Sequence, residues 1–194
     1  MKYLISTYIF LGILLLSCQP ENPKTLFQYI PHNKSGITFK NTLKETPEFN
    51  VMNYSYFYNG GGVATGDINN DGFCDIFFTG NLVASDLYLN KGDWKFENIA
   101  KSAGVEASGL WNTGVTMADV NGDGWLDIYI CRSAAQNPDS RRNLLFINQT
   151  SKDGTITFTE EAKKFGLDDP AYSTQAAFFD YDRDGDLDMF LLNH

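Results

Sequence analysis

The chain has 194 residues, of which 43% are hydrophobic and 14% aromatic, which is enough to build one domain with a buried core. Its formal net charge is −9, with 24 acidic and 15 basic residues. This excess of acidic residues excludes nucleic acid as a partner, because proteins that bind nucleic acid need a basic surface to neutralise phosphates.

The N-terminus is typical of a secretory signal. Lys2 precedes an apolar run over residues 8–16, which is shorter than the roughly 20 residues of a membrane-spanning helix. The run ends in Leu15-Leu16-Ser17-Cys18, which resembles a bacterial lipobox. That resemblance implies a signal peptide over residues 1–17, a lipidated Cys18, and a lipoprotein of the outer membrane or cell surface. An ordinary signal peptide and an uncleaved anchor are the alternatives.

Residues 18–35 are polar and contain prolines, and we expect them to form a linker between the membrane and a folded domain. Residues 36–41 are predicted to form a short strand. Residues 42–58 have no clean periodicity, and their aromatic end at residues 54–58 has no assigned role.

Three acidic loops share one nine-residue pattern, with oxygen-bearing side chains at positions 1, 3, 5 and 9 and glycine at position 6. Carboxylates held this close repel one another unless a cation lies among them, and calcium takes six to eight oxygen ligands. Glycine permits the sharp turn that closes such a loop. A solvated acidic turn is the alternative for any single loop. The predicted side-chain ligands are Asp67, Asn69, Asp71 and Asp75; Asp119, Asn121, Asp123 and Asp127; and Asp180, Asp182, Asp184 and Asp188.

Calcium fits these loops better than other metals. Zinc prefers histidine and cysteine, and magnesium prefers small octahedral sites that retain water. An EF-hand would need a glutamate at position 12, where this chain has Phe78, Ile130 and Leu191. We therefore expect up to three calcium ions. The third loop has four carboxylates where the others have three, so we expect it to bind calcium most tightly.

The loops belong to a repeat whose first aspartates stand at residues 67, 119 and 180. Each loop lies between two runs that are typical of strands, and two further short strands and a short tail follow the first two loops. This order predicts an all-β fold, a partial β-propeller of four-stranded antiparallel blades with calcium loops. The predicted strands are residues 62–66, 76–79, 87–90 and 95–97; 114–118, 128–131, 144–148 and 157–160; and 175–179 and 189–192.

The loops resemble the FG-GAP or VCBS-type repeats of the integrin α-subunit propeller. Together with Leu87-Tyr-Leu-Asn90, Lys95-Phe-Glu97 and the lipobox, they resemble bacterial FG-GAP-like lipoproteins of the CRTAC1 and ASPIC/UnbV-type group. The resemblance covers residues 36–194 and implies that the backbone carbonyls of Phe73, Trp125 and Asp186 complete the calcium sites. Such propellers usually have seven blades, whereas this chain has two complete repeats and an incomplete third. It is expected to be an N-terminal fragment of a longer propeller, or else an oligomer or open arc.

Two cysteines lie within the repeats. Cys74 stands at position 8 of the first loop and is predicted to be a small buried apolar residue. A disulfide to Cys131 in the following repeat is the alternative.

The predicted function is a non-catalytic, calcium-binding adhesion or binding module at the cell envelope, with a structural metal. Its partner would be an unknown protein or glycan, with the membrane reached through the lipid only. Candidate contacts are Trp94, Trp111 and Trp125, with packing between blades as the alternative role. A calcium-dependent glycan-binding lectin is the second hypothesis. An envelope hydrolase is the third; the chain has only two histidines, and neither a Gly-x-Ser-x-Gly nor a zinc motif.

Overall fold

The computed structural model describes residues 25–194. The predicted signal peptide and Cys18 therefore lie outside the described residues. Residues 25–30 hold no helix or strand, and residues 31–194 form one compact body. None of the helices in residues 25–194 has the length and apolar character needed to span a bilayer.

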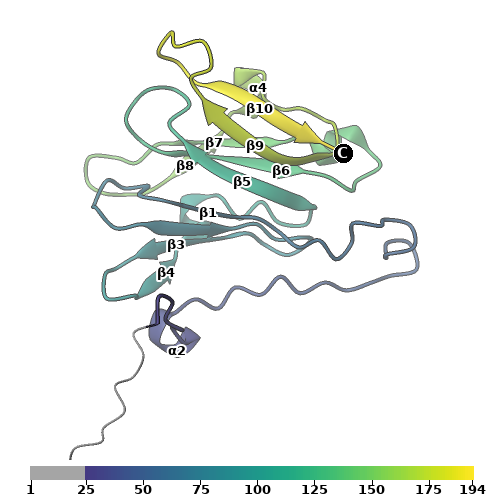
Figure 1. The fold of residues 1–194 in the computed structure, drawn as a ribbon, viewed down its shortest axis with the longest axis horizontal. Coiled ribbons are helices and arrows are strands. Elements are labelled where there is room, and N and C mark those ends of the chain that lie inside the picture. Colours follow the sequence, from purple (N-terminus) through teal and green to yellow (C-terminus); the bar gives the residue numbers. More distant parts are fainter. Residues whose placement is uncertain (1–24) are drawn as a thin grey trace, which may run out of the picture. The chain divides into compact units, whose positions relative to one another are not determined.

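The body consists of three antiparallel sheets (Figure 1). The first has the order β1-β2-β3-β4, the second β5-β6-β7-β8, and the third pairs β9 with β10. The strands of the first sheet are Val63–Gly66, Asp75–Phe78, Asp86–Asn90 and Phe96–Asn98; of the second, Asn112–Ala118, Asp127–Arg132, Leu144–Asn148 and Phe158–Glu160; of the third, Ser173–Phe179 and Asp188–Asn193.

These bounds confirm the predicted all-β class and the four-strand repeat. Each predicted strand of the repeats is present, shifted by at most two residues at either end. The tails after the fourth strands form the short helices α3 (Ala100–Ala103) and α4 (Ala162–Phe165), and a 3-10 turn covers Pro138–Arg141. The order of elements follows from alternating apolar strands separated by glycine- and aspartate-rich turns.

The core lies in two layers on either side of the second sheet. β6 is buried along its whole length, and its side chains alternate between the layers. Ile128 and Ile130 pack with Phe77 and Leu87 of the first sheet. Tyr129 and Cys131 pack with Ala176, Phe178 and Met189 of the third sheet. The alternating side chains of β6 thus pack against both the first and the third sheet.

The first strands of successive sheets approach so closely that their backbones touch. The Gly62 N–H donates to the Thr113 carbonyl at 2.8 Å, and the Thr113 hydroxyl donates to the Ser173 carbonyl at 2.8 Å. A Cβ at Gly62 would lie 2.8 Å from the Thr113 carbonyl oxygen, and one at Gly114 would overlap the Thr174 carbonyl. Small residues at the start of these strands therefore set the spacing of the sheets.

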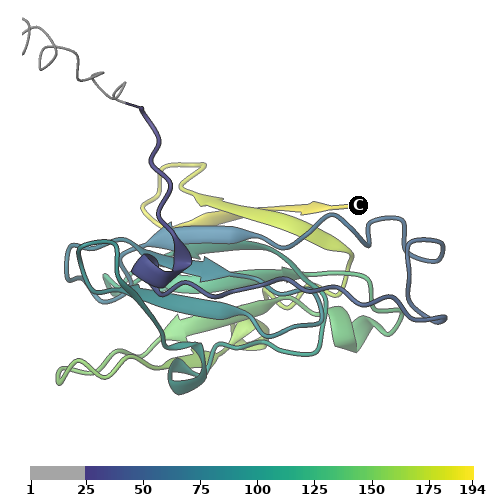
Figure 2. The same cartoon turned by 90° about the horizontal axis from the view of Figure 1, so that it is seen from below.

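The segment that precedes the repeats differs from its prediction. Residues 32–35, assigned to the linker, form the one-turn helix α2 (His32–Ser35), and the compact body begins at Pro31. The predicted strand at residues 36–41 was wrong: these residues are extended without joining a sheet, and run along the body (Figures 1 and 2). Their hydrogen bonds go to side chains instead, from the Thr38 N–H to the Tyr88 hydroxyl at 3.0 Å and from the Asn41 amide to Asn81 at 2.6 Å.

The predicted burial of Cys74 was also wrong, because position 8 of the first loop points to solvent. Cys131 is fully buried in β6. Both thiols are free, so the alternative of a disulfide between them is excluded. Burial raises the pKa of the Cys131 thiol to about 12.

Candidate metal loops and an aromatic cleft

Each acidic loop is the turn between the first two strands of its sheet. Gly72, Gly124 and Gly185 at position 6 have φ values of 87°, 88° and 98°, a region that favours glycine. The carboxylate at position 1 accepts hydrogen bonds from the N–H groups of positions 5 and 6 in every loop. For Asp67 these distances are 3.1 and 2.7 Å, and for Asp119 they are 3.0 and 2.8 Å. In the third loop Asp180 accepts the same bonds at 3.2 and 3.3 Å.

Positions 3 and 5 also face each other within the turns. The amides of Asn69 and Asn121 donate to the carboxylates of Asp71 and Asp123, each at 2.9 Å. The other oxygen of each position-5 carboxylate accepts the N–H of position 7, at 2.8 Å in the first loop and 2.9 Å in the second. In the third loop Asp184 accepts the Asp186 N–H at 3.1 Å. In the first two loops these bonds bring the side chains of positions 3 and 5 together.

The burial of the carboxylate at position 9 differs between the loops. Asp75 and Asp127 are fully buried. Asp75 accepts the N–H of Ile68 at 3.0 Å and of Asn90 at 2.7 Å, and Asp127 accepts the N–H of Val120 and Asn148 at 3.0 and 2.8 Å. Burial raises the pKa of Asp75 to about 6, and it also raises the pKa of Asp127.

Asp188, at position 9 of the third loop, is exposed and accepts only the Tyr181 N–H, at 2.8 Å. Carboxylate oxygens of Asp180, Asp182 and Asp188 lie within 4.8 Å of one another. In water such a cluster is tolerated, but it gains most from a cation at its centre.

The donor set fits a hard divalent cation. Within residues 25–194 the ion pairs join Arg142 to Asp139 and Asp168, and Lys164 to Glu161, so no lysine or arginine neutralises a loop carboxylate. The carbonyl oxygens of Phe73, Trp125 and Asp186 accept no hydrogen bond from the described part of the chain. Carboxylates, amide oxygens and free carbonyls are the ligands that calcium takes.

Two asparagines that the sequence analysis did not select hold the first two loops. Asn90 and Asn148 end the third strands, donate their backbone N–H groups to Asp75 and Asp127, and donate their side-chain amides to the position-8 carbonyls of Cys74 and Leu126, at 3.0 and 3.1 Å. The signal for them in the sequence is the asparagine that closes both third strands, at the same place in each repeat.

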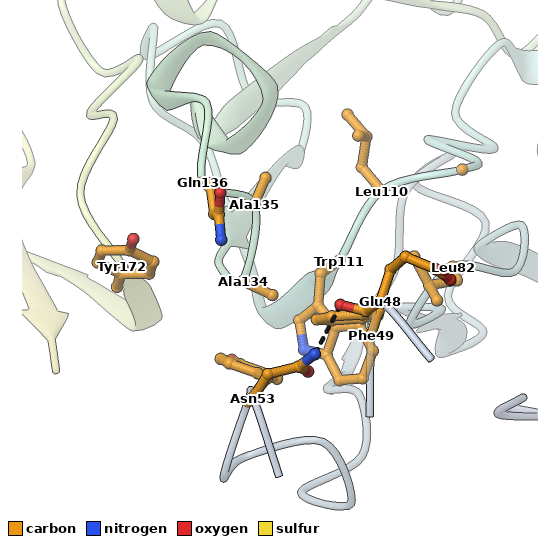
Figure 3. Close-up of a pocket in the computed structure, with 12 residues that line it drawn as sticks. Glu48, Phe49, Asn53, Leu82, Leu110, Trp111, Ala134, Ala135, Gln136 and Tyr172 are labelled. Atoms are coloured by element: carbon orange, nitrogen blue, oxygen red, sulfur yellow. Dashed lines mark hydrogen bonds between the residues drawn. The ribbon is translucent and has the colours of Figure 1, made fainter. Parts of the chain in front are cut away.

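The opposite end of the sheets carries a cleft of about 610 Å³ (Figure 3). It lies between the segment at residues 48–54, the turn after β2, the approach to β5, the turn after β6 and the approach to β9. Aromatic walls come from Phe49, Tyr54, Trp111 and Tyr172, and polar groups from Glu48, Asn53 and Gln136. Asn53 donates to the Glu48 backbone carbonyl at 2.7 Å, which steadies the segment that forms one wall.

The three candidate tryptophans lie in different settings. Trp111 is 3% exposed and packs against Phe49, Tyr54 and Phe57, so its edge contributes to the cleft while most of its ring belongs to the core. Trp94 is 62% exposed. Trp125 is half-buried and faces a cavity shared with Asn69 of the first loop. Packing, the alternative role, therefore applies to Trp111 and not to Trp94.

Comparison with known proteins agrees with this geometry. Residues 67–130 match the family model described as FG-GAP-like repeat. The chain is 36% identical over 138 residues to cartilage acidic protein 1 of Xenopus tropicalis, and 34% identical over 138 residues to the Homo sapiens protein of that name. Each match covers 70% of this chain, but the chain spans only 20% of the length of these relatives. The region from the first acidic loop into β6 is therefore an FG-GAP-like repeat, in a chain homologous to cartilage acidic protein 1.

Proposed function

We propose that this chain is part of a calcium-stabilised binding module without catalytic activity. The observation that carries the calcium assignment is the set of unneutralised oxygen donors that the three turns share at positions 1, 3, 5 and 9, with three carboxylates gathered within 4.8 Å in the third loop. When bound, calcium would offset the repulsion between the carboxylates and hold each hairpin closed. Ligands would be the side chains at positions 1, 3, 5 and 9, with the position-7 carbonyls of Phe73, Trp125 and Asp186.

A structural role for the metal follows from where the loops lie. Each joins the first two strands of its sheet, so an open loop would loosen the ladder that begins beside it. Binding to the folded state alone adds stability by mass action, about 2.7 kcal/mol when free calcium is a hundredfold above its dissociation constant. Direct metal catalysis would also need an acid or base poised beside the ion. Each position-5 carboxylate instead accepts a backbone N–H of its own loop.

The test is a calcium titration of the full chain by calorimetry, with thermal melting in calcium and in chelator. We expect saturation at up to three ions and a clear rise in melting temperature. Removing one position-1 carboxylate at a time, as Asp67→Ala, Asp119→Ala or Asp180→Ala, should lower the stoichiometry by one. Magnesium serves as the matched control and should give a smaller rise. A chain that binds no calcium in either assay refutes the proposal.

The cleft supplies the binding surface in this proposal, because it is a concave site of about 610 Å³ with aromatic walls and a few polar groups. A calcium-dependent lectin is the second candidate. Aromatic faces and neutral amides, as at Tyr54, Asn53 and Gln136, are groups that can stack on and hydrogen-bond a sugar. Binding on a glycan array that is lost on Gln136→Ala and Tyr172→Ala would favour it. Binding to protein ligands alone would favour adhesion between proteins.

Attachment to a bacterial cell envelope completes the proposal and rests on Leu15-Leu16-Ser17-Cys18. Lipid on Cys18 would tether the module, and the membrane would be reached in no other way. Metabolic labelling with a fatty-acid analogue tests this step: label should enter the wild-type chain and not the Cys18→Ala variant. Equal labelling of both would contradict the lipid anchor without touching the calcium assignment.

A further inference from the structure

The first two loops are connected to each other through the side chain of Asn148. Its amide nitrogen donates to the Ile68 carbonyl at 2.9 Å and to the Leu126 carbonyl at 3.1 Å. Ile68 is position 2 of the first loop, and Leu126 is position 8 of the second. Asn148 is 3% exposed, so these bonds form away from water, where loss of one partner is costly.

The orientation of this amide is fixed by its other end. The Asn148 side-chain oxygen accepts the Thr150 N–H at 2.9 Å and the Thr150 hydroxyl at 2.6 Å. An oxygen can accept both bonds, whereas an amide nitrogen in that place would face a second N–H donor. The nitrogen must therefore face the two loop carbonyls.

A continuous series of bonds then runs between the two buried position-9 carboxylates. Asp75 accepts the Ile68 N–H, and the carbonyl of Ile68 accepts the Asn148 amide. The backbone N–H of Asn148 donates to Asp127 at 2.8 Å. A shift of Asp75 toward an ion would move the Ile68 backbone, and with it the residue that holds Asp127.

Two further contacts join the same loops. The Asn70 amide, at position 4 of the first loop, donates to the carbonyl of Gly124 in the second at 3.1 Å. Asn69 and Trp125 line one cavity together with residues 150–152 and Gly154. The third loop has no such bond to the second loop among the described residues.

We infer that calcium binding at the first loop and at the second loop is positively coupled through Asn148. This inference rests on the proposed calcium function of the loops. Binding at either loop orders the amide that the other loop also uses, so the second ion meets a loop that is already partly ordered. The coupling must be reciprocal, because it is a free energy shared by the two sites.

Asn90 provides a matched control within the chain. It stands at the same place in the first sheet, and its amide donates to the Cys74 carbonyl at 3.0 Å. It makes the bond within one loop that Asn148 makes to Leu126, and within the described part of the chain it makes no bond to another loop. Asn90→Ala therefore removes support for one loop, whereas Asn148→Ala removes the connection between two.

The experiment measures metal binding mainly at the second loop. Terbium replaces calcium at oxygen sites and emits when a nearby indole transfers energy to it. Trp125 lies at position 7 of the second loop, where the others have Phe73 and Asp186. Titration of the full chain with terbium, excited at the indole band, thus reports mainly that loop, and Trp125→Phe should remove most of the signal.

Disabling the first loop with Asp67→Ala should weaken terbium binding at the second loop by about fivefold or more, within the usual range of coupling between sites. In an Asn148→Ala background the same change should have a much smaller effect, because only the bond from Asn70 to Gly124 still joins the two loops, and in an Asn90→Ala background the fivefold effect should persist. Asn70→Ala, an exposed change, should reduce the effect and serves as the second variant where Asn148→Ala does not fold. Circular dichroism checks folding of each variant.

Tight terbium binding that ignores Asp67→Ala would overturn the coupling and leave the calcium function standing. A coupling that survives Asn148→Ala unchanged would overturn the role of Asn148. Absence of terbium and calcium binding in the wild-type chain would overturn both the inference and the proposed function.

Discussion

The first two acidic loops and the third have the same pattern but different surroundings. All three form the same internal hydrogen bonds at positions 1 and 5. Asp75 and Asp127 are buried beneath a third strand whose last residue donates to them, whereas Asp188 is exposed and belongs to a sheet of two strands. The nine residues therefore specify the turn, while the rest of the sheet decides whether its last carboxylate is part of the core.

The largest expected difference in stability between the loops follows from removing the carboxylate at position 9. Asp127→Ala leaves the N–H groups of Val120 and Asn148 without acceptors, and each buried loss costs about 1 to 3 kcal/mol. We expect unfolding in urea, followed by circular dichroism in chelator, to show a loss of about 2 to 6 kcal/mol, on the same basis. Asp188→Ala, the matched exposed change, should cost under about 1 kcal/mol. Equal losses would erase the distinction between the loops.

A smaller effect is expected where the sheets touch. Five residues before each loop stand Gly62, Gly114 and Gln175. Gly62→Ala and Gly114→Ala would each force a methyl group against a neighbouring carbonyl, a strain of about 1 to 3 kcal/mol. Gln175 already carries a side chain, so Gln175→Ala should cost under about 1 kcal/mol. Melting temperatures of the three variants test this, and tolerance of both glycine changes would contradict the close approach.

The buried carboxylates also predict that the free energy of unfolding depends on pH with opposite signs in calcium and in chelator. The pKa of Asp75 is about 6 in the folded chain and 3.8 for an ordinary aspartate, so between these values the folded state holds a proton that the unfolded state has lost. The free energy of unfolding in chelator should therefore fall as pH rises through this window, and the raised pKa of Asp127 acts in the same direction.

Calcium requires the ionised carboxylate, so its stabilising effect should instead weaken as pH falls below about 6, where Asp75 gains its proton. Thermal melting at several pH values in calcium and in chelator measures both slopes. Slopes of the same sign under the two conditions would contradict this account.

The smallest expected effect concerns the order of affinity. Asp182 gives the third loop a fourth carboxylate, which predicts that it binds calcium most tightly at low salt. Because its charges are exposed, salt should screen them more than the buried Asp75 and Asp127. Titrations of Asp180→Ala and of the Asp67→Ala, Asp119→Ala double variant, each at low and high salt, separate the loops. We expect the third loop to lose a few-fold more affinity as salt rises.

The sequence predicts the strands of the repeats well because the acidic loops mark their ends and the runs beside the loops are rich in apolar and β-branched residues. β6 is the clearest case, since both of its faces are apolar and both are buried. The sequence fails at residues 36–41, where the partners are the distant side chains of Asn81 and Tyr88, and no local pattern records them. It fails at Cys74 because position 8 is apolar in the other loops, yet here it faces water.

The loop residues could be predicted because position and ligand chemistry are local. The supporting residues could not, because their role appears only when the third strand lies beside the loop. Asn148 looks in the sequence like the end of a strand before a turn, and its bond to Ile68 spans 80 residues. The cleft has the same origin, since its walls come from five segments that only the fold brings together.

The free thiols of Cys74 and Cys131, in the described part of the chain, can report two different stages of unfolding. Cys74 sits on the first loop beside Asp75 and is open to reagent, so its modification rate should follow the state of that hairpin. Cys131 is fully buried in β6, the strand that contacts both neighbouring sheets. Because its pKa is about 12, this thiol stays unreactive until β6 unfolds. One labelling time course can therefore separate loosening of a loop from loss of the whole body, without adding a foreign probe.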